Sequence, residues 1–518
     1  MRAWPLCLPG CCERRRAGKA GAGHPGYRLS QVPVKFPRDS ITPMSKLLKF
    51  ILFAVGGLLG LLVLVAVALH LFVDVNAYKP RLEAAASGAL GVEVRVGGRL
   101  GIGFFAGLYL ALEDVHIRNR WADIASAKEA RLGIDLLPLL QKEVRIGKIA
   151  LTNPKISIER DRDGKFNFEK PETAGGTLPA LDLAEVSVSG GTLLYSDKQS
   201  GEGLEAEDCS LDVHRLRLSR GKSSDFTKNF SFTAELACGE IRENGFTVSD
   251  LKLSAGEKNG VLDLKPITMR AFGAQGSGSF QADFSGAVPL YHVRYSLPQF
   301  HIDEFFKTLS PNKVAEGTMD FSANLSMQGK TANEIKQTAN GEISLRGKNL
   351  TLNGSDLDRQ FARFESSQNF NLVDVGAFFF AGPLGLAVTK GYNFASILQG
   401  SEGSSRIRIL VSEWKVERGV AQAQDVAMAT NENRIALQGG LDFVNERFHD
   451  VTVALIDVKG CAEARQKIRG PFRKPVVEQP SVLRSLTGPV LRLLKEGRDL
   501  FPGGDCEVFY AGSVAPPK

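Results

Sequence analysis

The side chains best suited to catalysis or metal binding are scattered in this sequence. His292 and His301 lie on either side of the segment YSLPQ, and Asp161 and Asp163 precede Gly164 in a partial match to a calcium loop. A histidine metal site needs further ligands at short spacing, and a calcium loop needs a glutamate at its twelfth position when the glycine is the sixth. Neither requirement is met, so strand histidines and a hairpin turn are the better interpretations.

Motifs for phosphate binding and nucleophilic catalysis are also incomplete. The glycines before Lys222 and Lys330 lack the upstream glycine of a phosphate loop, and the sequence contains neither G-x-S-x-G nor H-E-x-x-H. We therefore expect no enzyme, no cofactor and no metal site.

The positive charge is concentrated at the amino end. Residues 1–49 contain ten Lys and Arg against two acidic residues, whereas the remaining residues contain 54 basic and 55 acidic side chains. Nucleic-acid binding requires a basic surface on the folded part of a protein. We therefore expect no nucleic-acid partner.

Beyond residue 75 the dominant pattern is a period of two. In FSFTAELACGEI, Phe230, Phe232, Leu236 and Cys238 share one face, while polar residues alternate on the other. Similar segments recur with turn residues at short intervals, which favours antiparallel hairpins. The predicted fold is mainly β, with antiparallel sheets that form a curled groove or a sandwich and a few short helices. One of these helices is expected in NAYKPRLEAAASGALG, which starts at Asn76.

The candidate functional residues are apolar linings and not reactants. The candidates for a groove floor are Phe230, Phe232, Leu236, Leu251 and Leu253, together with Phe378, Phe379 and Phe380. For the Phe triplet, ordinary core packing is an equal alternative. Near the carboxyl end, anionic head groups could be contacted by Arg492, Lys495 and Arg498, although a solvated face explains these residues as well.

One segment is long enough to cross a membrane. His70 is the only titratable side chain between Phe50 and Val73, and about 20 apolar residues span a bilayer core. Lysines precede the run and Asp74 follows it, so the positive-inside rule predicts a cytoplasmic amino end and an exported body. Representative anchor residues are Phe50, Leu58, Leu62, Leu64, Leu71 and Phe72. A cleaved signal peptide is the alternative, because Ala66 to Ala68 form an A-x-A pattern.

The pattern predicts six regions. These are a disordered tail or misassigned start (1–43), the anchor (44–74), an amino-terminal β region (75–175), a central β region (176–300), a carboxy-terminal β region (301–460) and a helical tail (461–518). The exported part contains Cys209, Cys238, Cys461 and Cys506, which allow three pairings. We favour Cys209 with Cys238 and Cys461 with Cys506, since each pair closes a moderate loop. Buried free thiols are the alternative.

Two stretches resemble the AsmA family. At the amino end these are VDVNAYKPRLEAAASGALGVEVRVGGRLGIGFFAGLYLALEDVHIRN and the segment through ISIERDRDGKFNFEK, with the R-D-x-x-G-x-x-N turn at Arg160, Asp161, Gly164 and Asn167. Toward the other end, ANEIKQTANGEISLRGKNLTLNGSDLDRQFARF, ERGVAQAQDVAMATNENRIALQGGLDFVNERFHDVTVAL and KIRGPFRKPVV are similar to the family's carboxy-terminal region. The middle, residues 181–300, is similar to the family only in its succession of short β-type segments.

This resemblance implies a protein of the bacterial inner membrane that passes the bilayer once and faces the periplasm. It also implies a role in outer-membrane assembly or phospholipid handling, with phospholipid, the inner membrane and outer-membrane assembly proteins as partners. The apolar sheet faces, with few helices to cover them, agree with a groove that accepts acyl chains. The alternative is a closed β-sandwich that acts as a scaffold without binding lipid.

Overall fold

A computed structural model describes residues 57, 60, 75–104, 107–119, 122–135, 138, 145–168, 181–219, 230–243, 246–308, 315–354, 356–359, 361, 403–479, 481–482 and 506–517. Contacts divide the chain into Met1–Phe72 and Val73–Lys518, and the second unit is the subject below. Within the described ranges, no helix is long and apolar enough to cross a membrane. The six anchor residues predicted between Phe50 and Phe72 lie outside these ranges.

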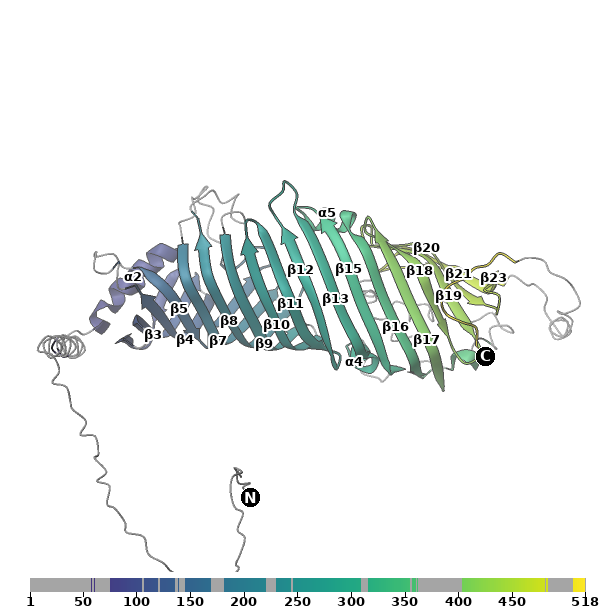
Figure 1. The fold of residues 1–518 in the computed structure, drawn as a ribbon, viewed down its shortest axis with the longest axis horizontal. Helices are drawn as coiled ribbons and strands as arrows, with labels where there is room; N and C mark the ends of the chain where they lie inside the picture. The colour runs from purple at the N-terminus through teal and green to yellow at the C-terminus, as the bar shows by residue number, and fades with distance from the viewer. Residues whose placement is uncertain are drawn as a thin grey trace, which may run out of the picture. The chain divides into compact units, whose positions relative to one another are not determined.

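The described strands form one 23-stranded sheet. Figure 1 shows its strands side by side and largely in chain order. The first strands are β1 (Glu93–Val96), β2 (Leu100–Gly103), β3 (Leu108–Asn119), β4 (Ala122–Ile134), β5 (Ile146–Thr152), β6 (Lys155–Arg160), β7 (Leu181–Asp197), β8 (Gly203–Leu218), β9 (Phe230–Glu243), β10 (Phe246–Lys258), β11 (Val261–Ala271) and β12 (Ala274–Asp283).

The remaining strands continue the same sheet. They are β13 (Leu290–His301), β14 (Ala315–Glu316), β15 (Thr318–Gln328), β16 (Asn340–Asn353), β17 (Ser404–Glu417), β18 (Val420–Ala429), β19 (Arg434–Asp442), β20 (Arg447–Ile456), β21 (Ala462–Pro471), β22 (Val476–Val477) and β23 (Ser481–Val482). The prediction of a mainly β protein is therefore confirmed. The predicted boundary between residues 300 and 301 falls inside β13.

Two features of the sheet differ from the prediction. The strands join one sheet instead of several, and β7 runs parallel to both β5 and β6. Strands β5 and β6 both pair with β4 and are separated only by Asn153 and Pro154, so they act as one kinked strand. Asn153 has a φ of 48°, which turns the chain at this point. The long strand β7 then covers both pieces, and this makes the sheet mixed.

The helices whose bounds the structure gives are short. They are the 3-10 helix η1 (Val75–Tyr78), α2 (Lys79–Leu90), α4 (Ile302–Lys307) and α5 (Ala332–Thr338). The predicted helix in the segment starting at Asn76 is confirmed as α2. It ends at Gly91, whose φ of 69° is the left-handed conformation that favours glycine.

Side chains from η1 and α2 accept hydrogen bonds from backbone amides at the first edge of the sheet. The amide of Val94 donates to Ser87 Oγ at 2.8 Å, and the amide of Val96 donates to Glu83 Oε1 at 2.7 Å. The Leu100 amide donates to Asn76 Oδ1 at 2.9 Å. An uncovered edge strand presents unpaired amides to other chains. The helical segment therefore blocks edge-to-edge pairing at β1 and β2.

Bulges bend the strands at recurring positions. Asp250, Gln299 and Asp450 have φ values of 52°, 53° and 49°, and each lies within a register shift between neighbouring strands. A bulge inserts one residue and increases the local twist and bend. Aspartate tolerates this left-handed conformation better than apolar residues do, which explains why Asp250 and Asp450 interrupt the alternating pattern.

Close packing across β12 gives a stability prediction. A Cβ atom on Gly278 would overlap the carbonyl oxygen of Arg294 and lie 2.8 Å from Tyr295 Cδ2, whereas a Cβ atom on Gly256 of β10 meets nothing within 4 Å. Gly278→Ala should lower the free energy of unfolding by about 1–3 kcal/mol through overpacking. Gly256→Ala should have no comparable cost. Urea titration followed by circular dichroism checks this pair, and equal losses would contradict the packing seen at Gly278.

Candidate lipid-binding face

One apolar face continues across neighbouring strands from β3 to β13, and we call it the trough face. Cross-strand pairing aligns one row of its side chains at the same level. The row contains Leu112, Ala130, Leu151, Val188, Leu211, Leu236, Leu253, Ile267, Gly278 and Tyr295. Except for Ala130 and Gly278, its members carry large apolar or aromatic side chains, and all of these are half-buried. The sheet therefore offers a continuous and partly accessible apolar strip.

All five lining residues predicted on β9 and β10 lie on the trough face. Leu236 pairs with Leu253, Leu251 pairs with Cys238, and the rings of Phe230 and Phe232 lie 5.2 Å apart. The side chains of these five residues are half-buried. Their contact with lipid stays a prediction. Phe378, Phe379, Phe380, Arg492, Lys495 and Arg498 lie outside the described residues.

The second half of the same sheet is closed. Phe300, Met319, Leu410, Met428, Ile435 and Leu455 belong to one core cluster, and each is at most 4% exposed. Leu410, Met428, Ile435 and Leu455 are successive cross-strand partners on β17 to β20, just as Leu236 and Leu253 are partners on the trough face. The sheet thus changes from an open apolar face to a packed core along its length.

The opposite face of this closed half is covered by the carboxyl-terminal residues. Tyr510 and Val514 pack on Val411, Ala427, Ala436 and Ile456 in a second cluster. The Tyr510 hydroxyl donates to Asp425 Oδ1, and the amide of Ser513 donates to Asp425 Oδ2 at 3.0 Å. Burial is the main cause that raises the pKa of Tyr510, so its hydroxyl remains a donor at neutral pH.

Among the described residues, two disulfides join positions that the sheet brings together. Cys209 is bonded to Cys238, its cross-strand partner on β9. Cys461 is bonded to Cys506 and holds the segment that contains Tyr510 against the sheet. These are the pairings that the sequence favours.

A buried acid stands at the end of β10 on the trough face. Glu257 is 7% exposed and lies between its cross-strand partners Phe232 and Leu262. Its Oε1 accepts a hydrogen bond from the Gly260 amide at 2.9 Å, and Oε2 has no partner among the described residues. Burial raises the pKa of Glu257 above its ordinary value. The side chain is thus biased toward its neutral form.

The raised pKa of Glu257 predicts a pH dependence. A carboxyl whose folded pKa exceeds its unfolded pKa stabilises the fold fully below the unfolded pKa of about 4.3, and this stabilisation is lost as pH rises through the folded pKa. Glu257→Gln cannot ionise, so its melting temperature relative to wild type should increase from acid to mildly alkaline pH. Melting curves of both proteins across that range test this, and a constant difference would contradict it.

Tyr295 places a hydroxyl group near the end of the trough row. Its hydroxyl is buried and has no hydrogen-bond partner within the described part of the chain. Burial raises the pKa of this hydroxyl. Gly276 and Gly278 clear the space that its ring occupies, since a Cβ atom on either glycine would contact the ring or hydroxyl. A donor is therefore held among apolar side chains where the trough face approaches the closed core.

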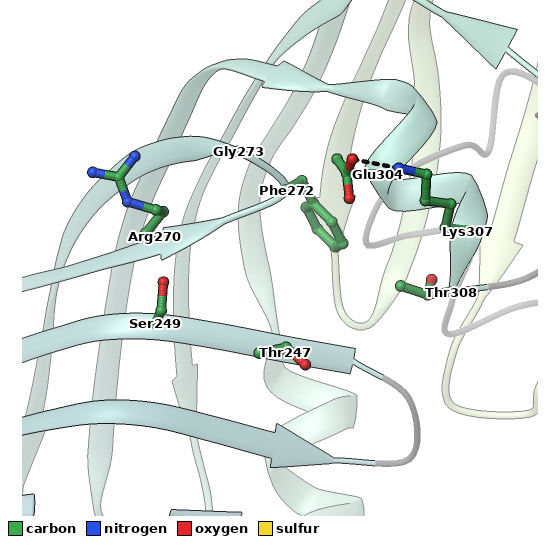
Figure 2. A pocket seen from close by; sticks show the side chains of 8 residues that line it. All are labelled: Thr247, Ser249, Arg270, Phe272, Gly273, Glu304, Lys307 and Thr308. Carbon is green, nitrogen blue, oxygen red and sulfur yellow. Dashed lines mark hydrogen bonds and ion pairs between the residues drawn. The ribbon is translucent and has the colours of Figure 1, made fainter. Parts of the chain in front are cut away.

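A small cavity of about 280 Å³ lies between α4 and the ends of β10 and β11 (Figure 2). Thr247, Ser249 and Arg270 line it from the strands, and Glu304 and Lys307 line it from the helix. Its cations are paired, because Arg270 lies 3.4 Å from Asp250 and Lys307 lies 2.5 Å from Glu304. The cavity is therefore a polar notch without an uncompensated charge, and the trough face is the stronger candidate.

Sequence reasoning missed two parts of this arrangement. Helix α4 buries Ile302, Phe305 and Phe306, which stand at i, i+3 and i+4 and could have identified an amphipathic turn. The alternating glycines of AQGSGSF could have indicated a close approach of other atoms to this strand, and the Tyr295 side chain makes that approach. The burial of Glu257 could not be predicted in this way, because acidic residues are common at the ends of strands.

The fold and its apolar face define a class: β-rich proteins in which one long sheet exposes an apolar surface. The chain belongs to the AsmA family, whose family model matches residues 44–228 and 217–377, more than half of its 518 residues. The match includes the central region, which resembled the family only in its succession of short β-type segments. It does not extend beyond residue 377, although further resemblance was expected as far as the segment KIRGPFRKPVV. No curated protein and no solved structure matches the chain.

Proposed function

We propose that this protein binds phospholipid by holding acyl chains on the trough face, without catalysing a reaction. The observation that supports this most directly is the contrast within one sheet. Large apolar side chains of the trough row remain half-buried on β8 to β11, whereas the buried members of the core cluster on β17 to β20 are at most 5% exposed. An apolar surface of this continuity usually marks an interaction site in a soluble body.

Unbranched acyl chains suit this surface physically. The trough row presents mainly Leu, Ile and Val side chains without an ionised group, so it offers no partner for a charged peptide. Each acyl methylene removed from water gains about 0.8 kcal/mol, and roughly ten methylenes on the face would gain about 8 kcal/mol before the cost of ordering the chain. Binding of even part of one lipid tail is therefore favourable.

The proposed location is the bacterial inner membrane, with one pass and the bulk of the chain in the periplasm. The apolar run from Phe50 to Val73 would be the anchor, and only Asp74 separates its end from Val75, the first residue of η1. Two disulfides suit an oxidising compartment. Membership of the AsmA family supports an envelope role. Outer-membrane assembly proteins are the proposed protein partners.

A scaffold without lipid is the second candidate function. The observation that favours it is the closed core, where both faces of β17 to β20 are covered. A protein of this kind would use its outer surfaces to hold other envelope proteins together.

Lipid analysis of the purified protein separates the two functions. The full chain is purified in mild detergent, washed extensively and extracted, and phospholipid per mole of protein is measured by mass spectrometry. Lipid binding predicts phospholipid that persists through washing. Loss of phospholipid to the level of an unrelated single-pass membrane protein would favour the scaffold.

A further inference from the structure

The trough face leads directly into the closed core. Its row continues from Tyr295 to Ala323, Ile343 and Trp414, which are successive cross-strand partners on β13, β15, β16 and β17. Ala323 and Ile343 are half-buried, but Trp414 is only 1% exposed. The Trp414 indole Nε1 donates to Ser412 Oγ at 2.8 Å, which fixes the ring in the core.

Helix α4 forms the first part of a barrier at the end of β13, next to Phe300. Ile302 and Phe305 are 0% and 1% exposed, and the Ile302 amide donates to the Gly317 carbonyl at 3.1 Å. The Phe272 ring lies 5.3 Å from Phe305 in an edge-on arrangement and 6.0 Å from Phe300. Figure 2 shows Phe272 directed from its strand end toward α4. Phe300 and Phe305 are buried by this packing, and Phe272 is half-buried against them.

A second segment, which contains Leu357 and Phe361, packs into the core next to β17 and the end of β18. Leu357 and Phe361 are 3% and 1% exposed within the same cluster. The Leu357 amide donates to Ser405 Oγ at 2.6 Å, and Asp358 Oδ1 accepts hydrogen bonds from Thr430 and Asn433. The segment is therefore fixed to the strands by polar contacts as well as by burial.

We propose that the lipid compartment is blind-ended, a conclusion that rests on the proposed function. Acyl chains occupy the trough face from β3 to β13 and stop at the wall formed by Phe272, Phe300, Phe305 and Trp414. The carboxyl-terminal half is not a passage for lipid. Phospholipid therefore enters and leaves through the open side of the first half, and a partner that receives it must approach there.

The native tryptophan of the core supplies a test. The chain contains Trp4, Trp121 and Trp414, so W4F/W121F leaves Trp414 as the single emitter. A matched protein adds Leu253→Trp and Trp414→Phe, which moves the emitter to the trough row. Both full-length proteins are loaded with phosphatidylcholine brominated on its acyl chains, which quenches tryptophan on contact, and bound lipid is quantified by mass spectrometry. Leu236→Trp replaces Leu253→Trp if the latter does not fold.

The expected result is loss of most emission from the trough tryptophan and retention of emission from Trp414. Quenching of Trp414 to the same extent would overturn the blind end while leaving lipid binding intact. Bound lipid that quenches neither the Leu253→Trp nor the Leu236→Trp protein would overturn the assigned compartment. Absence of bound lipid would instead contradict the proposed function and the inference with it.

Discussion

Phospholipid recovered with the purified protein should fall to background when Phe232 and Leu236 are both replaced by aspartate. Both side chains are half-buried on the trough face of β9, where an acyl chain would cover them. A carboxylate covered by hydrocarbon loses its hydration, which costs several kcal/mol without a paired cation. Without lipid the same side chains can reach water, so circular dichroism and the melting transition should remain close to wild type. Recovered lipid is measured by mass spectrometry.

The same strand offers a matched control for this experiment. Thr233 alternates with Phe232 and is exposed on the opposite face. Thr233→Asp adds a carboxylate to β9 without placing it on the trough face, so lipid recovery should be unchanged. Unfolding of the Phe232→Asp, Leu236→Asp protein would mark the face as a closed core and contradict the account. Equal lipid loss in the Thr233→Asp control would show that added negative charge, and not its position on the trough face, causes the loss.

Truncation of Phe305 should have the largest effect on stability. Phe305 is 1% exposed and contacts the rings of Phe272 and Phe306. Removing a buried phenyl ring typically costs about 3–5 kcal/mol through lost transfer energy and the remaining cavity. Phe305→Ala should therefore lower the free energy of unfolding by about that amount. Urea unfolding followed by circular dichroism measures the change.

Phe232→Ala serves as the comparison for Phe305→Ala. Phe232 is half-buried on the trough face, so truncation removes less buried surface and should cost well under half as much. If both variants lose the same free energy, the trough face is packed as tightly as the core. That result would contradict the contrast on which the lipid-binding proposal rests.

Alternation predicted the strands well because its physical cause is local. In β9, Phe230 to Cys238 point to one face at every second residue, and this follows from the strand itself. The pairing of Cys209 with Cys238 was also within reach, since one loop joins two strand-like segments that become neighbours. Gly91 ended helix α2 as its conformational preference indicates.

The remaining features depend on contacts between distant residues. Leu236 and Leu410 both belong to alternating segments, yet one is half-buried and the other is 0% exposed. The difference follows from the core cluster, which contains Leu410 together with Phe305 and Leu357 but does not include Leu236. The parallel course of β7 likewise depends on its pairing with β5 and β6. Periodicity within one strand carries no information about either.

A density map of the purified full-length protein tests the central claim most directly. The account predicts elongated density without polypeptide connectivity over Leu236, Leu253 and Ile267, ending before the ring of Trp414. Polypeptide packed over these three side chains, leaving no accessible apolar surface on β9 to β11, would contradict it.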